Sequence, residues 1–242
     1  MNDASASRKA MNDASASRKA MNDASASRRA MNMADGYYDT RYAHDPRRQA
    51  VWRHVTRHLQ QWVPSGADVL ELGAGYCDFS NNVVARSRVA MDLRPEFAAF
   101  AVQGVRTEVG DCRDLSRFDD ASVDLVFASN LLEHLDLAAN GDLVQHVRRV
   151  LRPGGRLVLV QPNYRLRPRE YFDDYTHVTV FSDRSLPDFL AAQGMTVEHV
   201  KARFLPFTMK SRLSFGHLLV PLYLRLPYRP LAGQMLVVAS ND

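Results

Sequence analysis

The chain has 242 residues, 46% of them hydrophobic, with 31 Lys and Arg against 27 Asp and Glu. These values are ordinary for a soluble globular protein, and they exclude a collagen-like chain, a disulfide framework and a mainly disordered chain. Residues 1–30 hold 6 basic and 3 acidic side chains, which leaves 25 basic and 24 acidic ones and a net charge near +1 in residues 31–242. A body this close to neutral argues against a nucleic-acid substrate.

Residues 1–30 are three copies of one ten-residue unit, MNDASASRKA twice and then MNDASASRRA. The unit is small and polar, so it cannot bury enough apolar surface to offset the entropy lost on ordering. We therefore expect a disordered tail over residues 1–32 and one folded domain over residues 33–242.

The sequence also bears on the cellular compartment. It shows no apolar segment that resembles a secretion signal or that is long enough to cross a bilayer. Its 2 cysteines, Cys77 and Cys112, are sparse for a secreted disulfide framework. Both observations favour a cytoplasmic protein with free thiols.

In chain order, the apolar residues Trp52, Val55 and Leu59 recur at helical spacing and predict a helix over residues 45–62. Short apolar runs then alternate with helical segments. The predicted strands lie at residues 67–72, 87–92, 105–109, 123–129, 156–161, 195–204 and 234–239. The further predicted helices lie at residues 79–86, 143–151 and 182–193, with one more opened by Pro95. This alternation predicts an α/β fold with a parallel sheet.

Residues 205–233 form a long connection between the last two predicted strands. A connection of this length inside a compact domain is typically a lid or an interaction surface. Its Leu218–Leu226 stretch is rich in Leu and Tyr, which would also suit contact with a membrane, but Pro221 and Pro227 interrupt it. A lid or interaction insertion is the favoured interpretation.

A glycine-rich turn follows the first predicted strand, in the run Glu71-Leu72-Gly73-Ala74-Gly75. Gly73 and Gly75 allow the backbone to turn tightly and to approach a ligand closely. Asp92 ends the next predicted strand, 19 residues after Gly73, where an acid can accept hydrogen bonds from both hydroxyls of a ribose. The two features together predict an adenosine-containing ligand.

Five motifs in order carry a more specific resemblance: VLELGAGYCDF, VAMD, VGDCRDL, DLVFASNLLEHL and LRPGGRLVLVQPN. Over residues 67–161 the chain resembles the class I S-adenosylmethionine-dependent methyltransferases. The resemblance implies S-adenosylmethionine as cofactor and a Rossmann-like, seven-stranded, mostly parallel sheet with an antiparallel last strand and helices on both faces. The residues that it implies for cofactor binding are Glu71, Gly73, Ala74 and Gly75 at the methionine end, Asp92 at the ribose, Asp111 and Cys112 at the adenine, and Asn130 near the sulfonium. One departure is Cys77, where such proteins often carry glycine.

Methyl transfer from a sulfonium needs in-line positioning and removal of the nucleophile's proton. His177, oriented by Asp173 or Asp174, is the candidate base for a hydroxyl acceptor. Its D-x-x-H run before a Phe-Ser helix start also resembles a subset of these enzymes that act on sugars and other small hydroxylated molecules. A purely structural interpretation, in which His177 fastens a loop, remains open, and for His134 packing or bracing is favoured. No metal ion is expected.

We therefore expect a methyltransferase that acts on a small molecule or a glycan, with methylation on oxygen. Two alternatives remain: a non-catalytic scaffold that binds S-adenosylmethionine, and a nicotinamide-dependent oxidoreductase, although the third glycine of that fingerprint is missing after Gly75. Six basic residues are candidates to hold a phosphate or carboxylate of the acceptor: Arg165, Arg167, Arg169, Arg203, Lys210 and Arg212.

Overall fold

The computed structural model describes residues 46–207 and 219–242 of the chain. The expected tail over residues 1–32 and residues 208–218 of the expected insertion lie outside this described part. In the described part, no helix combines the length and the hydrophobicity that crossing a membrane requires.

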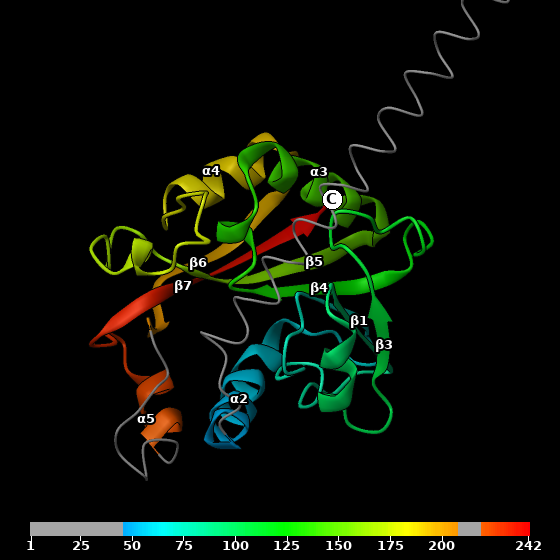
Figure 1. The fold of residues 1–242 in the computed structure, drawn as a ribbon, viewed down its shortest axis with the longest axis horizontal. Coiled ribbons are helices and arrows are strands. Elements are labelled where there is room, and N and C mark those ends of the chain that lie inside the picture. Colours follow the sequence, from blue (N-terminus) through cyan, green and yellow to red (C-terminus); the bar gives the residue numbers. More distant parts are fainter. Residues whose placement is uncertain (1–45, 208–218) are drawn as a thin grey trace, which may run out of the picture. The chain divides into compact units, whose positions relative to one another are not determined.

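A seven-stranded sheet with the order β3-β2-β1-β4-β5-β7-β6 organises the fold (Figure 1). The strands are β1 (Asp68–Leu72), β2 (Ser87–Asp92), β3 (Arg106–Val109), β4 (Val123–Ser129), β5 (Leu151–Pro162), β6 (Thr196–Pro206) and β7 (Ala232–Asn241). Strands β1 to β5 pair in parallel, and β7 runs antiparallel to both of its neighbours, β5 and β6. The expected Rossmann-like sheet with an antiparallel last strand is confirmed.

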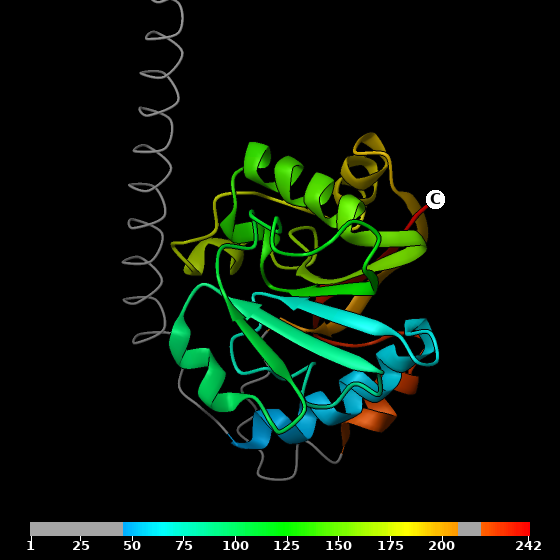
Figure 2. The ribbon, with the colours of Figure 1, turned by 90° about the vertical axis from the view of Figure 1, so that its right-hand side faces the viewer.

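Helices cover both faces of the sheet, as expected (Figure 2). The α-helices are α2 (Pro46–Leu59), α3 (Leu137–Val150), α4 (Ser185–Ala192) and α5 (Val220–Arg225), and the 3₁₀-helices are η1 (Gln60–Trp62), η2 (Pro95–Phe100), η3 (Leu132–His134) and η4 (Tyr171–Asp173). Alternate residues of each strand face opposite ways. Leu70 therefore packs with α3 and α4, whereas Val69 packs with α2 and α5.

Helix α2 shows why the spacing of apolar residues predicted it. Trp52, Val55 and Leu59 are all buried, and the Trp52 ring meets Phe127 of β4 edge to face, with the ring centroids 6.1 Å apart. The predicted helix over residues 45–62 is thus found, with its last turn tightened into η1. Burial of one continuous stripe against the sheet stabilises it far more than its intrinsic propensity.

The helix predicted over residues 79–86 is not formed; residues 75–82 make a series of turns instead. Cys77 adopts a left-handed backbone with φ 54°, which interrupts helical geometry. The side-chain amide of Asn81 donates to Phe100 O (2.9 Å) and that of Asn82 to Asp78 O (2.8 Å). The Asn82 bond is local and competes with a helix, whereas the Asn81 bond ties the segment to η2, 19 positions along the chain. The helix N-terminus expected to follow the glycine turn is therefore absent from residues 75–82.

The described part of the expected insertion packs onto the domain. Leu224 of α5 is buried in the same cluster as Trp52. The buried guanidinium of Arg229 donates to Phe204 O (3.2 Å) and to Leu224 O (2.5 Å). Leu222 is exposed on the other side of α5. This segment is therefore anchored to β6 while keeping apolar side chains at its surface.

Candidate functional site

The candidate residues gather at one edge of the sheet. Gly73 follows β1, Asp92 ends β2, Asp111 follows β3 and Asn130 follows β4. Because these strands are parallel, their carboxyl ends lie at the same edge, where open α/β sheets bind their ligands. The structure thus brings together residues that are up to 57 positions apart in the sequence (130 minus 73).

The turn after β1 depends on its two glycines. Gly73 has φ +63° and Gly75 has φ +52°, values that L-residues with a side chain rarely adopt. A Cβ on Gly73 would lie 3.0 Å from Cδ1 of Leu131, so space is tight as well. Between the glycines, the N–H of Ala74 donates to Met91 O at 3.0 Å, which ties the turn to β2.

Asp92 is a buried acid fixed against this turn. Its Oδ2 accepts a hydrogen bond from Gly75 N (2.8 Å), and its Oδ1 accepts one from Arg94 N (3.1 Å). Burial raises the pKa of Asp92, and these backbone donors counter part of that rise. Each carboxylate oxygen has a further lone pair, so Asp92 can still accept from two hydroxyl groups.

Glu71 braces the segment that follows the turn. Its Oε2 accepts from Ser80 N (2.8 Å) and from Ser80 Oγ (2.5 Å). Burial raises the pKa of Glu71 to about 8. The carboxyl group thus holds residues 71 and 80 together, in addition to any contact with a ligand.

Arg48 of α2 is a residue of this region that the sequence reasoning missed. Its Nε lies 2.5 Å from Oδ2 of the buried Asp78, just beyond the glycine turn. The guanidinium also lies 5.9 Å from the ring centroid of Tyr76. Nothing local signals this contact, because the two residues are 30 positions apart.

The loop after β3 contains Asp111, Cys112 and Arg113. Arg113 Nε lies 3.0 Å from both carboxylate oxygens of Asp111. Burial acts to raise the pKa of Asp111, but the hydrogen bonds and charge of Arg113 outweigh it and leave the pKa below its ordinary value. Burial raises the pKa of the Cys112 thiol to about 12. Cys112 and the fully buried Cys77 are both free thiols.

Asn130 turns the chain from β4 into η3. It has a left-handed backbone (φ 50°), which asparagine tolerates better than most residues. Its N–H donates to Val160 O at 2.9 Å, and its side-chain amide donates to Ser129 Oγ at 3.2 Å. Glu133 and His134 follow directly on η3, so they lie at the same edge as the glycine turn.

Backbone bonds bring His177 to η3 from 43 positions away (177 minus 134). Val178 N and Thr179 N both donate to Glu133 O, at 2.8 and 3.1 Å. The ring centroids of His134 and His177 then lie 5.0 Å apart. Their Nε2 atoms lie 3.9 and 4.0 Å from Glu133 Oε1. We call Glu133, His134 and His177 the EHH cluster.

Two members of the EHH cluster are shielded from water, whereas the side chain of His134 is 23% exposed. The Glu133 side chain is 2% exposed and that of His177 6%. Burial raises the pKa of Glu133 to about 8. Burial lowers the pKa of His134 to about 4, helped by the neighbouring His177. The sequence reasoning had assigned His134 to packing and had not singled out Glu133 as a functional residue.

Asp174, the expected partner of His177, makes side-chain contacts elsewhere. Its Oδ1 accepts from Thr176 Oγ1 (2.6 Å) and Thr176 N (3.1 Å), while its backbone O accepts from His177 N (3.2 Å). Thr176 Oγ1 in turn lies 2.8 Å from His134 Nδ1. Asp174 therefore shapes the turn that carries His177 and reaches His134 through Thr176.

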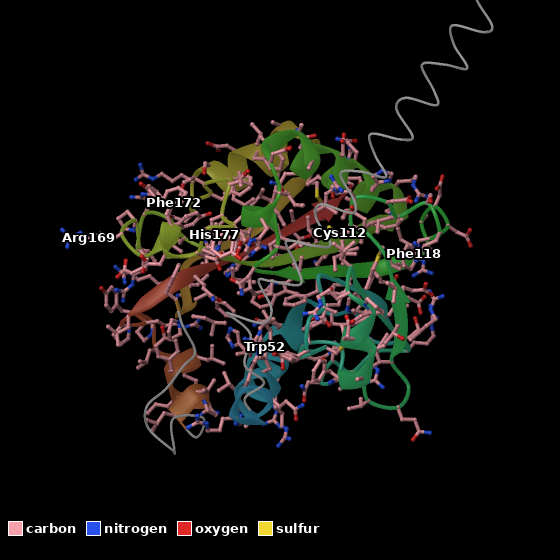
Figure 3. All side chains as sticks on the ribbon, viewed as in Figure 1. Trp52, Cys112, Phe118, Arg169, Phe172 and His177 are labelled. Carbon is pink, nitrogen blue, oxygen red and sulfur yellow. The ribbon has the colours of Figure 1, made fainter. Side chains whose placement is uncertain are left out.

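The loop around His177 exposes aromatic side chains. Phe172 is 55% exposed and Tyr175 62%. His177 lies inward of Phe172 and Arg169, which is at the tip of the loop (Figure 3). Two of the six basic candidates are paired: Arg165 Nη1 lies 3.1 Å from Asp183, and Arg167 Nη1 lies 3.3 Å from Glu170. Of the other four, Lys210 and Arg212 lie outside the described residues.

Comparison with known proteins decides the family. Residues 70–159 match the family model of the methyltransferase domain. The chain carries a class I, S-adenosylmethionine-dependent methyltransferase domain. A domain of this kind makes the protein a methyltransferase with S-adenosylmethionine as its methyl donor.

Solved structures share the fold of this methyltransferase. One is the methyltransferase in complex with the Haloferax volcanii Trm112 methyltransferase activator, with a TM-score of 0.60, 19% identity and coverage of 80% of this chain and 90% of that one. Another is an S-adenosylmethionine-dependent methyltransferase from Mesorhizobium loti, with a TM-score of 0.57, 18% identity and coverage of 79% of this chain and 97% of that one. A third, from Archaeoglobus fulgidus, has a TM-score of 0.57, 18% identity and coverage of 84% of this chain and 97% of that one. No curated protein matches the sequence. At these identities the solved structures show the fold alone.

The methyltransferase's own residues fit its cofactor chemically. The left-handed turn at Gly73 and Gly75 presents backbone without side chains. Asp92 retains lone pairs for ribose hydroxyls, beside two backbone donors that already fix it. Asp111 is held ionised by Arg113, which suits acceptance of a hydrogen bond from an amine. When bound, S-adenosylmethionine supplies an activated methyl group on a sulfonium.

Proposed function

We propose that this methyltransferase transfers the methyl group to a hydroxyl oxygen of a small molecule or a glycan. The observation that carries the proposal is the EHH cluster beside Asn130, at the edge of the sheet where the cofactor residues gather. A hydroxyl must lose its proton to become a competent nucleophile, whereas a neutral amine attacks without prior deprotonation. A pair of neighbouring imidazoles at this place, that of His177 buried and that of His134 partly exposed, suits the first acceptor and is unnecessary for the second.

The cofactor residues take these roles in the proposal. The turn from Gly73 through Ala74 to Gly75 cradles the methionine end, with Glu71 beneath it. Asp92 accepts from the ribose hydroxyls, Asp111 accepts from the adenine amine, and Cys112 lies beside the ring. Asn130 closes the site next to the sulfonium. Their common place at the carboxyl ends of β1 to β4 supports this assignment.

His177 activates the acceptor in the proposal, and Asp174 holds the turn that positions it. The acceptor oxygen attacks the methyl carbon in line with the carbon–sulfur bond. The new carbon–oxygen bond forms as the carbon–sulfur bond breaks, and S-adenosylhomocysteine leaves. The hydroxyl proton passes to the imidazole of His177. The backbone bonds from Val178 and Thr179 to Glu133 O support a rigid position for His177.

Three observations bear on the acceptor and together support a small, uncharged one. The exposed rings of Phe172 and Tyr175 lie within five positions of His177 and offer apolar faces to a ring-shaped molecule. Arg165 and Arg167 already have carboxylate partners, which leaves less cationic surface for a phosphate. The near-neutral charge of the body also disfavours a nucleic-acid acceptor.

The test uses the purified chain, S-adenosylmethionine with a labelled methyl group, and matched pairs of acceptors that differ in a hydroxyl or an amine. We expect label on the hydroxyl members. His177→Gln should lower kcat by about 10²–10⁴-fold while leaving the affinity for S-adenosylhomocysteine unchanged. Transfer to the amine members alone, or an unchanged kcat in His177→Gln, would overturn the proposal.

A further inference from the structure

The EHH cluster has the donor set of a metal site. One oxygen of Glu133 and one ring nitrogen each of His134 and His177 all lie within 4.8 Å of one another. Two imidazoles and a carboxylate form a common three-ligand set for Zn²⁺ and for other first-row divalent ions. We propose that Glu133, His134 and His177 bind one divalent first-row metal ion of the kind represented by Zn²⁺.

Glu133 is the first argument for an ion. It is buried, and apart from its own backbone N–H neither carboxylate oxygen has a hydrogen-bond donor among the residues that the structure describes. Burying a carboxyl group without such bonds is costly even when it is protonated, and coordination of a metal ion is one way in which proteins satisfy a buried carboxylate. The ion-pair neighbours within 4.0 Å of Oε1 in the described part are the two imidazoles, which are themselves metal ligands.

The distances form the second argument. Glu133 Oε1 lies 3.9 Å from His134 Nε2 and 4.0 Å from His177 Nε2. These separations are too long for direct hydrogen bonds. Ligands at about 2.0–2.1 Å from a tetrahedral ion lie about 3.3 Å apart. The three ligand atoms, which lie within 4.8 Å of one another, would therefore approach by about 0.6–1.5 Å to close the site. The three atoms thus face one point without yet touching one another.

The orientation of His134 is the third argument. The Thr176 hydroxyl donates its hydrogen to Asp174 Oδ1 at 2.6 Å, so its oxygen accepts from His134 Nδ1–H at 2.8 Å. This relay places the imidazole proton on Nδ1 and leaves the lone pair on Nε2, the nitrogen that lies 3.9 Å from Glu133 Oε1. Metal-binding histidines typically have such a partner on the other ring nitrogen, and it fixes both tautomer and ring orientation.

The ion's role in turnover rests on the proposed function, whereas its binding does not. Three protein ligands leave at least one coordination position open. A hydroxyl acceptor bound there loses its proton to solvent more easily, because the ion lowers the pKa of a bound hydroxyl. With the ion bound, His177 acts as a ligand of the ion instead of as the base that takes the proton, and in this point the inference modifies the proposed function. This departs from the metal-free site that the sequence led us to expect.

The experiment measures metal binding without any acceptor. The full-length, untagged chain is stripped with a chelator and titrated with Co²⁺, whose visible absorption reports imidazole ligation, and then with Zn²⁺ in competition. We expect one ion per chain. Glu133→Gln and His177→Gln should abolish the absorption band, and Thr176→Val should weaken binding about 10- to 100-fold. His199→Gln, a histidine on β6, is the matched control and should bind like the unmodified protein.

A thermal measurement separates ligation from a structural role. At a hundredfold excess over Kd, the ion should raise the melting temperature of the unmodified chain by about 5–10 °C. Glu133→Gln should melt no lower than the stripped protein and should show no rise with Zn²⁺. No ion bound, or the same affinity in Glu133→Gln and His177→Gln as in the unmodified chain, would overturn the metal site.

Turnover assays on the same samples keep the two proposals apart. Metal binding without methylation of any hydroxyl acceptor overturns the proposed function and leaves the site intact. Hydroxyl methylation that is unchanged after the ion is removed supports the proposed function and overturns the ion's role in activation.

Discussion

The carboxylate of Asp92 accepts a hydrogen bond from Gly75 N, 2.8 Å away, so the acid that ends β2 and the turn that follows β1 form one unit. The bond joins residues 17 positions apart. The N–H of Ala74 adds a second link to the same strand, through Met91 O. A change in either the acid or the glycines should therefore disturb both halves of the cofactor site.

Asp92→Asn should weaken the binding of S-adenosylhomocysteine by about 10- to 100-fold, because a hydrogen bond to a charged group contributes about 1.5–3 kcal/mol. Asparagine keeps one oxygen that can still accept from Gly75 N, so folding should survive. Isothermal titration calorimetry gives the affinity. Asp142→Asn, at an exposed acid on α3, is the matched control and should bind normally. Equal affinity in Asp92→Asn would refute the ribose assignment.

Gly73→Ala should lower both stability and cofactor affinity. A left-handed backbone costs an L-residue about 1–2 kcal/mol, and the new Cβ would also lie 3.0 Å from Leu131 Cδ1. Gly154→Ala is the control, since Gly154 has φ +73° but nothing within 4 Å of the place that a Cβ would take. Denaturant unfolding should show a loss in both variants, larger for Gly73→Ala. Calorimetry should show weaker cofactor binding in Gly73→Ala alone, and a normal affinity there would contradict the cradle role.

The sheet could be predicted because each strand carries its own signal. Residues 87–92 and 123–129 were predicted to the residue, since each has a short apolar stretch close to turn residues. The helix at 79–86 failed because a left-handed Cys77 has no local signature in a sequence. The EHH cluster could not be predicted, because His177 meets Glu133 only through backbone bonds formed in the folded state. Sequence spacing thus predicted that the candidate cofactor residues share one edge of the sheet, but it did not predict the EHH cluster.

The two thiols should react slowly in the folded protein. Burial raises the pKa of Cys112 to about 12 and that of Cys77 still further. At pH 7.5 the thiolate, which is the reactive form, is then roughly 10⁻⁴ to 10⁻⁵ of Cys112. Ellman's reagent should label neither cysteine within minutes at pH 7.5 and both in denaturant. The native rate should rise about tenfold per pH unit as the thiolate fraction grows. Labelling at the rate of free cysteine would contradict the raised pKa of both thiols.

Glu71 should make stability depend on pH. Burial raises its pKa to about 8 in the folded protein, whereas an unfolded glutamate titrates near about 4.3. Between these values the folded state binds more protons than the unfolded state, so the free energy of unfolding falls as pH rises through this window. Glu71→Gln cannot titrate and should remove that fall.

Urea unfolding of both proteins at pH 5, 6.5 and 8 isolates this contribution, because the other titrating groups are common to both. Between pH 5 and pH 8, the free energy of unfolding of the unmodified chain should fall by a few kcal/mol relative to that of Glu71→Gln. The full effect is on the order of 1.4 kcal/mol for each unit by which the pKa differs between the folded and unfolded states. Ser80→Ala should extend the fall to higher pH, since the Ser80 hydroxyl stabilises the ionised form of Glu71. Parallel pH profiles for the unmodified chain and Glu71→Gln would show that the carboxyl group is already ionised at neutral pH.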